Sequence, residues 1–295
     1  MRKLNERFYG QKNLKHQIIK LIMSFKNKKE KKGLSVLLTG ASGVGKTSMF
    51  RYAAQVAGIP FHKISLNGVD TAYYLQGSPR LYENATVGCI MEAVHKIGNR
   101  GIIMLDEVDK TEKNSDGGNP LTALYNLLDP DENFIDCMIE SEIDLSDIIF
   151  VCTANDSSKL PSAILDRVYE IYVPEYTAEE KIRIARDFLI KKLMNQYEWG
   201  DTKLKWDEDC IDDIANKYTL HDGIRDIEKN IGAIIRSVMR IMKKSNCHEF
   251  TVTKENVSEL LDIVPFRRDK IVHDISGLKN KFKFFKYEYS EQSRR

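Results

Sequence analysis

The chain has no apolar run that approaches the roughly 18 consecutive residues that a membrane-spanning helix needs. Its N-terminus is charged and lacks the apolar core of a signal peptide. Internal repeats and low-complexity segments are also missing. No charge is in excess, because 45 Lys and Arg residues stand against 43 Asp and Glu residues, so the overall charge does not indicate binding to nucleic acid or to a membrane.

Cysteines are few, and their spacing fits neither a disulfide framework nor a structural zinc site. There are five of them, an odd number, with no CxxC pair. An odd number of cysteines without a CxxC pair favours a reducing compartment, and we expect a cytoplasmic protein. The 295 residues are 42% hydrophobic, which is enough for one good core and a small additional domain.

The most informative motif is a glycine-rich loop that follows the apolar run at 36–38 and precedes a helical pattern, as in a nucleotide-binding P-loop. Its glycines leave backbone N–H groups free to contact phosphate, Lys46 would neutralise the β- and γ-phosphates, and the Thr47 hydroxyl would bind Mg²⁺. We therefore predict that the chain binds ATP with Mg²⁺. The predicted phosphate-binding residues are Gly40, Ala41, Ser42, Gly43, Val44, Gly45, Lys46, Thr47 and Ser48.

A second motif lies about sixty residues further on, where the apolar run Gly101–Leu105 ends in two carboxylates. Asp106 is predicted to orient Mg²⁺, and Glu107 to polarise the attacking water. Phosphoryl transfer depends mainly on positioning and on charge neutralisation, so these two carboxylates and the P-loop would supply most of the chemistry.

Two further residues fit the same site. The apolar run 148–154 ends in Asn155, and a strand beside the P-loop would bring this side chain close to the γ-phosphate. Asn155 could help to hold the attacking water, although Asn is also frequent in turns that end strands. Arg167 follows a short helical pattern; it could stabilise phosphoryl-transfer charge in a neighbouring subunit, or form a local ion pair with an acidic side chain.

With these motifs, the chain resembles the AAA+ ATPase module of the Lon protease family from about Tyr9 to about Phe266. The segments that carry the resemblance are Gly-Val-Gly-Lys-Thr-Ser (43–48), Ile-Ser-Leu-Asn-Gly-Val (64–69), Leu-Asp-Glu-Val-Asp-Lys (105–110), Leu-Leu-Asp-Pro (127–130), Phe-Val-Cys-Thr-Ala-Asn (150–155) and Tyr-Thr-Ala-Glu-Glu-Lys (176–181).

The resemblance implies a role for each matching residue. Asp106 and Glu107 would be the Walker B pair, and Asn155 sensor 1. Arg167 would be the arginine finger and Arg225 sensor 2. Tyr9 and Gly10 would cup adenine. The resemblance also implies a homo-oligomeric ring, expected to be a hexamer, that acts on unfolded protein.

The sequence also departs from the family. The P-loop begins at Gly40, so we expect no N-terminal substrate-binding region. Only 29 residues follow Phe266, so we also expect no protease domain, which needs on the order of 100 residues. No Ser-Lys dyad can be identified, so we expect no peptidase activity. In the loop that grips polypeptide in Lon proteins, Tyr82 matches the aromatic residue, but Glu83 replaces its aliphatic neighbour. Residues 113–119 are predicted to form a second pore-facing loop or a simple connection.

We expect an α/β fold: a P-loop AAA+ core with a parallel sheet, followed by a smaller helical lid. Strands are predicted at 35–39, 61–66, 101–106 and 148–153, and a capping box at Thr177 and Glu180 should begin the lid. From there the pattern predicts helix to about residue 262, with a brief strand at 251–253. The predicted domains are an N-terminal helix and basic loop (1–33), the core (34–176), the lid (177–266) and a basic and aromatic tail (267–295).

The function that this sequence favours is ATP hydrolysis coupled to protein remodelling or unfolding. One alternative is a DNA-directed AAA+ ATPase of the clamp-loader or initiator type, which would contact DNA through the lysine-rich segment 26–32 and the tail residues 279–289. A second alternative is a module that uses ATP only to fix its assembly. A separate protease partner remains open.

Overall fold

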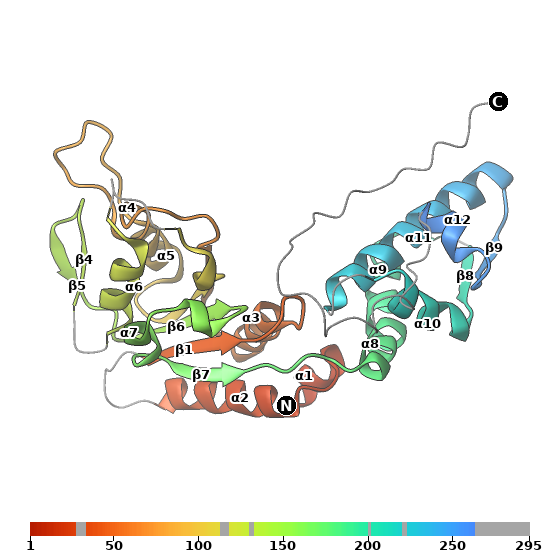
Figure 1. Ribbon diagram of the computed structural model, residues 1–295, viewed down its shortest axis with the longest axis horizontal. Helices are drawn as coiled ribbons and strands as arrows, with labels where there is room; N and C mark the ends of the chain where they lie inside the picture. The colour runs from red at the N-terminus through yellow and green to blue at the C-terminus, as the bar shows by residue number, and fades with distance from the viewer. Residues whose placement is uncertain (28–33, 113–117, 130–132, 200–201, 220–222, 263–295) are drawn as a thin grey trace, which may run out of the picture.

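The computed structural model describes residues 1–27, 34–112, 118–129, 133–199, 202–219 and 223–262. Within this part, an α/β core is followed by a mainly helical lid that lies to one side of it (Figure 1). The predicted tail, most of the lysine-rich segment and most of the predicted second pore loop lie outside the described residues.

The core is built on a five-stranded parallel sheet with the strand order β2-β3-β6-β1-β7. Its strands are β1 (Leu34–Thr39), β2 (Phe61–Ser65), β3 (Gly101–Asp106), β6 (Ile148–Ala154) and β7 (Tyr169–Tyr172). The predicted parallel sheet and its four predicted strands are confirmed. The fifth strand, β7, was not predicted; it is only four residues long and three of its residues are exposed, so its apolar pattern is weak.

Alternate residues of the central strands point to opposite faces of the sheet. Val36 and Leu38 of β1 belong to one buried cluster, and Leu37 belongs to the other. Every residue of β3 and β6 is buried, which explains why these strands read as unbroken apolar runs.

Helices cover both faces of the sheet. On one face lie α2 (Lys12–Asn27) and α3 (Lys46–Ala57), and the short α1 (Arg2–Arg7) contacts α3. On the other face lie α4 (Tyr73–Gln76), α5 (Cys89–Ile97), α6 (Pro120–Leu128) and α7 (Ser162–Leu165). Two single 3₁₀ turns, η1 (Val108–Lys110) and η2 (Ser157–Lys159), follow β3 and β6. The strand order places the carboxyl ends of β3, β6 and β1 next to one another, so the residues that follow them meet at one edge.

The structure confirms the predicted capping box at the start of the helical region that follows the sheet. Thr177 Oγ1 accepts a hydrogen bond from the Glu180 main-chain N–H at 3.2 Å, and Glu180 Oε2 accepts one from the Thr177 N–H at 3.0 Å. The first lid helix runs through α8 (Ala178–Ile184) and α9 (Ile190–Met194), with a π-helical turn, η3 (Ala185–Leu189), between them. Such π-helical turns are frequent at functional sites.

The rest of the lid contains α10 (Glu208–Lys217), α11 (Ile224–Ser245) and α12 (Val257–Leu261). A parallel strand pair, β8 (Lys203–Trp206) and β9 (Glu249–Val252), joins segments far apart in the sequence. The sequence predicted only a strand near β9, and its partner β8 was wrongly expected to be helical. Buried side chains of the lid belong to the same cluster as those of α2 and α3, so lid and core share one hydrophobic core.

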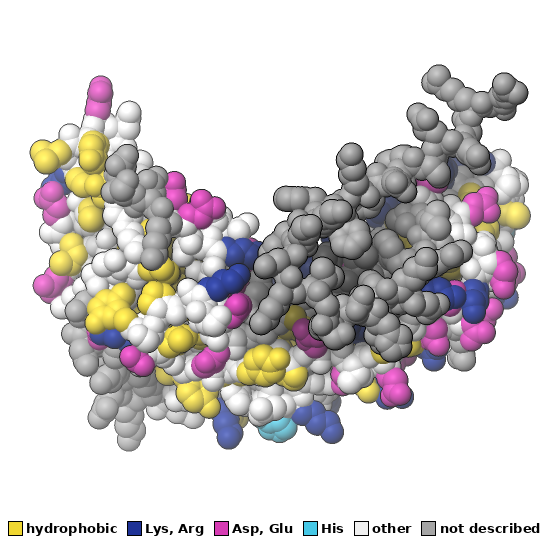
Figure 2. All heavy atoms as spheres, viewed as in Figure 1, with side chains coloured by type: hydrophobic (Ala, Val, Ile, Leu, Met, Phe, Trp, Pro, Cys, Tyr) yellow, Lys and Arg dark blue, Asp and Glu magenta, His cyan; other side chains and the backbone are white. Residues whose placement is uncertain are grey.

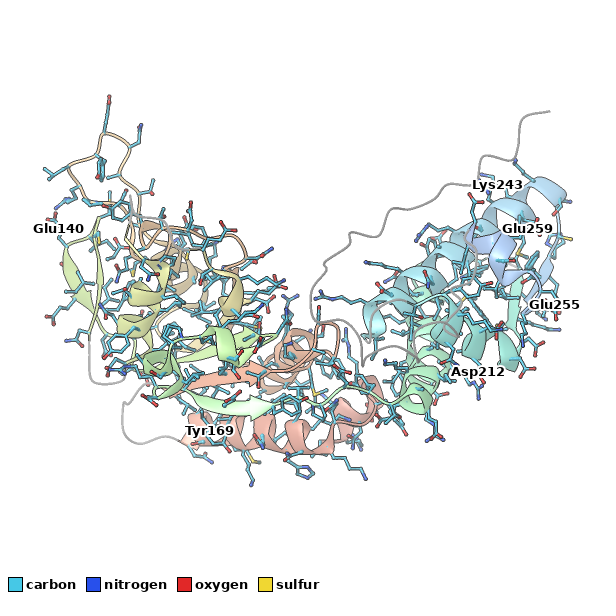
Figure 3. The ribbon with its side chains drawn as sticks, viewed as in Figure 1. Glu140, Tyr169, Asp212, Lys243, Glu255 and Glu259 are labelled. Carbon is cyan, nitrogen blue, oxygen red and sulfur yellow. The ribbon has the colours of Figure 1, made fainter. Side chains whose placement is uncertain are left out.

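The loop between α4 and α5, which carries Tyr82, projects from the core at the upper left of Figure 1, beside a hairpin of β4 (Phe134–Asp136) and β5 (Ser141–Ile143). Glu140, at the hairpin turn, lies far from the lid (Figure 3). The hairpin is joined to the loop by the buried carboxylate of Asp136, which accepts hydrogen bonds from the N–H groups of Gly88 at 2.8 Å, Met138 at 2.9 Å and Ile139 at 3.1 Å.

Replacing this carboxylate should therefore destabilise the fold. In Asp136→Ala the buried Gly88 N–H and the partly buried N–H groups of Met138 and Ile139 lose their carboxylate acceptor, and we expect the free energy of unfolding to fall by about 3 kcal/mol. Urea unfolding measures the change. The control is Glu142→Ala on the same hairpin. Among the described residues its exposed carboxylate accepts a hydrogen bond from Asn133, and the change should stay within about 0.5 kcal/mol. Equal effects of the two substitutions would show that Asp136 does not hold the hairpin.

Candidate nucleotide site

The P-loop joins the end of β1 to the first turn of α3. Gly45 precedes the helix with φ 93°, and a Cβ atom there would touch nothing within 4 Å, so it is the backbone conformation that requires glycine. At Gly40 a larger residue is excluded by a steric clash, because a Cβ atom would lie 2.2 Å from the Val173 carbonyl oxygen. No side chain caps the first turn of α3, so its N–H groups are available to a phosphate.

Lys46 is the buried cation of this loop. Its Nζ donates hydrogen bonds to the carbonyl oxygens of Gly40 at 2.5 Å and Ala41 at 3.0 Å, and to Asn155 Oδ1 at 3.2 Å. Burial lowers the pKa of the Lys46 ammonium group, while the charges of Asp109 and then Asp106 act in the opposite direction. The P-loop and the residue after β6 are therefore connected through one side chain.

Asp106 is the buried carboxylate at the end of β3. Its Oδ1 accepts hydrogen bonds from Thr47 Oγ1 at 2.9 Å and from Thr153 Oγ1 at 2.6 Å, and its Oδ2 pairs with Lys63. Burial acts to raise the pKa of Asp106, but the bonds from Lys63, Thr153 and Thr47 outweigh it and hold this pKa below its ordinary value. An ionised carboxylate beside a hydroxyl is an oxygen donor set that suits Mg²⁺, and Thr47 and Asp106 are the residues that would hold it.

Glu107 adopts a left-handed backbone conformation, with φ 61° and ψ 47°, which is uncommon for a residue other than glycine. Its main-chain N–H donates to Thr153 Oγ1 at 3.0 Å, so the Thr153 hydroxyl contacts both residues of the carboxylate pair. The Glu107 carboxylate forms an ion pair with Lys110 at 2.8 Å. Unusual backbone geometry of this kind gathers at functional sites.

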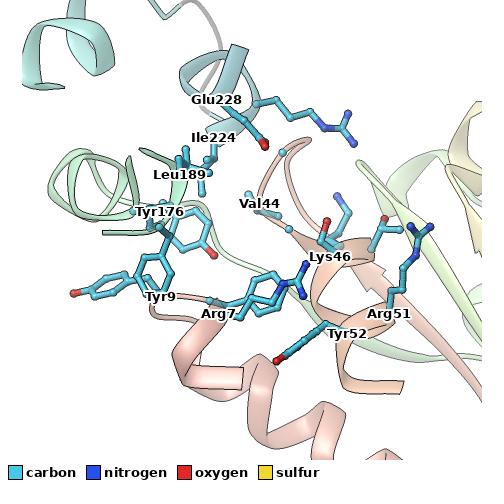
Figure 4. A pocket seen from close by; sticks show the side chains of 18 of the residues that line it. Arg7, Tyr9, Val44, Lys46, Arg51, Tyr52, Tyr176, Leu189, Ile224 and Glu228 are labelled. Carbon is cyan, nitrogen blue, oxygen red and sulfur yellow. The ribbon is translucent and has the colours of Figure 1, made fainter. Parts of the chain in front are cut away.

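A cleft of about 670 Å³ extends from these groups toward the lid. Figure 4 shows the Tyr9 and Tyr176 rings on one side of it and Lys46 and Arg51 on the other. The Phe8 and Tyr52 ring centroids are 5.8 Å apart, and the Arg7 guanidinium lies 4.5 Å from the Tyr52 ring centroid. Aromatic walls beside a phosphate-binding loop suit a purine base.

The lid closes one side of the cleft through the start of α11. Figure 2 shows Lys and Arg side chains on the core where it approaches the lid. The Ile224 N–H donates to the Gly43 carbonyl oxygen and Arg225 Nη1 to Ser42 Oγ, both at 3.4 Å. A Cβ on Gly223 would lie 2.5 Å from the Ser42 carbonyl oxygen, so the two glycine segments approach closely. The π-helical residues Asp187, Phe188 and Leu189 also line the cleft.

Most residues predicted from the sequence meet in this cleft. The predicted residues that line it are Tyr9, Ser42, Gly43, Val44, Gly45, Lys46, Thr47, Ser48, Asp106, Glu107, Asn155 and Arg225. Gly40 and Ala41 lie directly behind it as acceptors for Lys46. Gly10 does not line the cleft; it lies beside Tyr176 and Glu180 of the lid side.

Arg167 and Tyr82 lie elsewhere. The Arg167 guanidinium pairs with Asp129 at 2.7 Å, bonds Tyr125 Oη and stacks on the Tyr125 ring with its Cζ 3.6 Å from the centroid. Arg167 therefore forms an ion pair within the chain, but its partner is Asp129, distant in the sequence, and the pair is partly buried, unlike the local surface pair considered from the sequence. Tyr82 is 55% exposed in the projecting loop, its ring lies 6.2 Å from the Tyr73 ring, and the neighbouring Leu81 is 98% exposed.

Several residues of the site were missed from the sequence. Thr153 stands two residues before Asn155, and the period-2 pattern of a strand could have placed both on one side of β6. Lys63 and Tyr52 carried no signal, because a lysine in a strand and a tyrosine in a helix are ordinary surface residues until the fold brings them to the cleft.

Comparison with known proteins gives two family matches. Residues 36–175 match the family described as "ATPase family associated with various cellular activities (AAA)", and residues 185–250 match "Lon protease AAA+ ATPase lid domain".

Among the similar proteins are Lon proteases of three organisms. The chain is 34% identical to that of Lawsonia intracellularis over 269 residues, 90% of this chain and 32% of the relative. It is 36% identical to that of Methanosphaera stadtmanae over 266 residues (89% and 32%) and 36% identical to that of Mycoplasma mobile over 236 residues (79% and 28%). The chain thus spans about a third of the length of the curated relatives it matches.

Two substitutions separate nucleotide binding from hydrolysis. Lys46→Ala should weaken ATP binding by about 100-fold, because it removes the buried cation of the phosphate site. Glu107→Gln keeps the shape of the side chain and should leave ATP affinity within about threefold, while the hydrolysis rate falls by at least about 100-fold. Fluorescent-nucleotide titration and phosphate release measure the two effects. Equal loss of affinity in both variants would contradict these assignments.

Proposed function

This chain belongs to the AAA+ ATPases of the Lon type, and we propose that it uses ATP hydrolysis within a homo-oligomeric ring to remodel or unfold protein. The observation that carries the proposal is the single cleft in which the P-loop, the Thr47 and Asp106 oxygen pair, Glu107 and Asn155 meet. We take the core as residues 34–176 and the lid as 177–266, since the sheet ends at Tyr172 and Thr177 caps the first lid helix.

Each side chain of the cleft has a proposed part in hydrolysis. Lys46, now bonded to its own loop, would move its bonds from the Gly40 and Ala41 carbonyl oxygens to phosphate oxygens. Thr47 and Asp106 would hold Mg²⁺, which when bound neutralises phosphate charge. Glu107 would accept the proton of the attacking water after leaving Lys110, and Asn155 would hold that water in line.

A ring is proposed because Arg167, which the family resemblance makes the arginine finger, is not among the residues that line the cleft of its own chain and pairs with Asp129 instead. Arg167 would act on the nucleotide of a neighbouring copy, and the relatives' family makes a hexamer the ring size that we propose. Within its own chain, Asp129 and Tyr125 hold the Arg167 guanidinium in one place, which suits a group that must meet a partner's site.

Protein is the proposed substrate because the relatives are named Lon proteases and because the α4–α5 loop exposes Leu81 and Tyr82. No observation on the described residues favours DNA, since the lysine-rich segment and the tail lie largely outside them. A separate protease remains a proposed partner. In the described part of the chain no helix is long and apolar enough to cross a membrane, and all five cysteines are free thiols. These thiols support the proposed cytoplasmic location.

The substrate proposal is tested by the Tyr82 loop. An unfolded protein should stimulate ATP hydrolysis, and Tyr82→Ala should remove most of this stimulation while the basal rate stays within about twofold, because Tyr82 lies outside the cleft. The matched control is Tyr74→Ala, another exposed tyrosine near the loop. Stimulation by DNA with a steep salt dependence would favour the alternative instead, and no stimulation by either polymer would leave only the assembly role.

The ring proposal is tested by mixing variants. Arg167→Ala and Lys46→Ala should each hydrolyse little ATP, but mixed rings contain interfaces that join an intact P-loop to an intact Arg167. We expect the mixture to recover about a quarter of the sites or fewer and hence measurable turnover. Each variant mixed with itself is the control. If mixing recovers nothing although both variants assemble, Arg167 acts only within its own chain.

A further inference from the structure

Asp109, three residues after Asp106, binds the main chain that carries Asn155. Its Oδ2 accepts a hydrogen bond from the Asn155 N–H at 3.0 Å and a second from the Asp156 N–H at 3.2 Å. Asp109 belongs to the 3₁₀ turn η1 after β3, whereas Asn155 follows β6. A single carboxylate therefore connects the segments that leave two neighbouring strands.

These hydrogen bonds lie where the sheet itself no longer holds the two segments together. The pairing of β3 with β6 ends at Leu105 and Cys152. Beyond that pair, Thr153 of β6 bonds Asp106 and the Glu107 N–H, while Asp109 bonds the chain after β6 in the opposite direction. The side chains of Thr153 and Asp109 thus connect the two segments beyond the end of the strand pairing. These segments carry the proposed catalytic groups Glu107 and Asn155.

We propose that Asp109 is a positioning residue for ATP hydrolysis, which fixes the Asn155 side chain by holding the main-chain N–H groups of Asn155 and Asp156. The Asn155 amide is placed by its own backbone, and its Oδ1 lies 3.2 Å from Lys46 Nζ, so a shift of the backbone would change what Asn155 can reach. A displacement of about 1 Å is enough to cost a large part of a catalytic rate.

Asp109 Oδ1 is buried and has no hydrogen-bond partner among the described residues, so only one carboxylate oxygen takes part in the contact. An amide oxygen could accept the same two hydrogen bonds, whereas the negative charge of Asp109, which an amide lacks, acts to raise the pKa of the buried Lys46, against the larger effect of burial. Holding the main chain and supplying charge are therefore separable by substitution.

The experiment uses the whole chain with MgATP. Asp109→Ala should lower kcat by about tenfold and leave the affinity for a non-hydrolysable ATP analogue within about twofold, because Asn155 acts on the water rather than on bound phosphate. Asp109→Asn should keep kcat within about threefold, since its amide oxygen restores the acceptor. The control is Asp156→Ala, whose exposed carboxylate accepts hydrogen bonds from the N–H and Oγ of Ser158 and, in the described part of the chain, bonds neither Asn155 nor Lys46.

Two further measurements separate positioning from general damage. If Asp109 acts through Asn155, the double variant with Asn155→Ala should be no slower than Asn155→Ala alone, whereas additive losses would overturn the proposal. Hydrogen exchange of the Asn155 and Asp156 amides should accelerate in Asp109→Ala and remain slow in Asp109→Asn. Loss of nucleotide affinity together with kcat, or an unchanged kcat in Asp109→Ala, would also overturn it.

If Asp109→Ala does not fold, Asp109→Asn alone tests whether Asp109 positions Asn155. Slow amide exchange with kcat near the wild-type value supports positioning, and slow exchange with kcat as low as in Asn155→Ala would overturn it. The proposal rests on ATP hydrolysis at this cleft. Absence of hydrolysis by the wild-type chain would refute the proposed function, while amide exchange at residues 155 and 156 would still report what Asp109 holds.

Discussion

The buried carboxylate of Asp106 is the constraint on which the rest of the site depends. A charge with 7% of its residue surface exposed is stable only if donors surround it, and here they come from three different segments. Thr47 belongs to the P-loop helix, Thr153 to β6 and Lys63 to β2. Satisfying one charge therefore fixes the phosphate loop, the central strand and an outer strand relative to one another before any nucleotide binds.

Toward the lid, the hydrogen bonds around the cleft become longer. Lys46 and Asn155 are connected within the core, whereas the contacts of Ile224 and Arg225 with the P-loop are both 3.4 Å long and weak by geometric criteria. The aromatic wall of the cleft combines Tyr9, which precedes the core, with Tyr52 of α3 and with Tyr176 at the end of the core, and Ile224 of the lid also lines the cleft. A nucleotide in this cleft would contact all three parts of the chain, which makes it a suitable coupling agent between lid and core.

Much of the fold and of the site was predictable because the chemistry is local in sequence. The P-loop glycines, Lys46 and Thr47 lie within residues 40–47, a single stretch of the sequence. Continuous apolar runs identify fully buried strands such as β3 and β6. What escaped prediction depends on contacts between distant segments. β8 is a strand only because β9 lies beside it, and Asp109 became significant only when β6 was placed next to β3. Arg167 could be read in two ways, and only the structure showed which local partners it has.

The central claim is that this cleft hydrolyses ATP with a divalent metal held by Thr47 and Asp106. The most direct measurement is phosphate release from ATP by the unmodified chain, followed first with Mg²⁺ and then with the metal removed by EDTA. The account predicts steady release with Mg²⁺ and release close to the buffer blank without it, since a metal held by Thr47 and Asp106 would supply the charge that neutralises the phosphates during hydrolysis. Release that is the same with and without Mg²⁺, or none in either case, would contradict it.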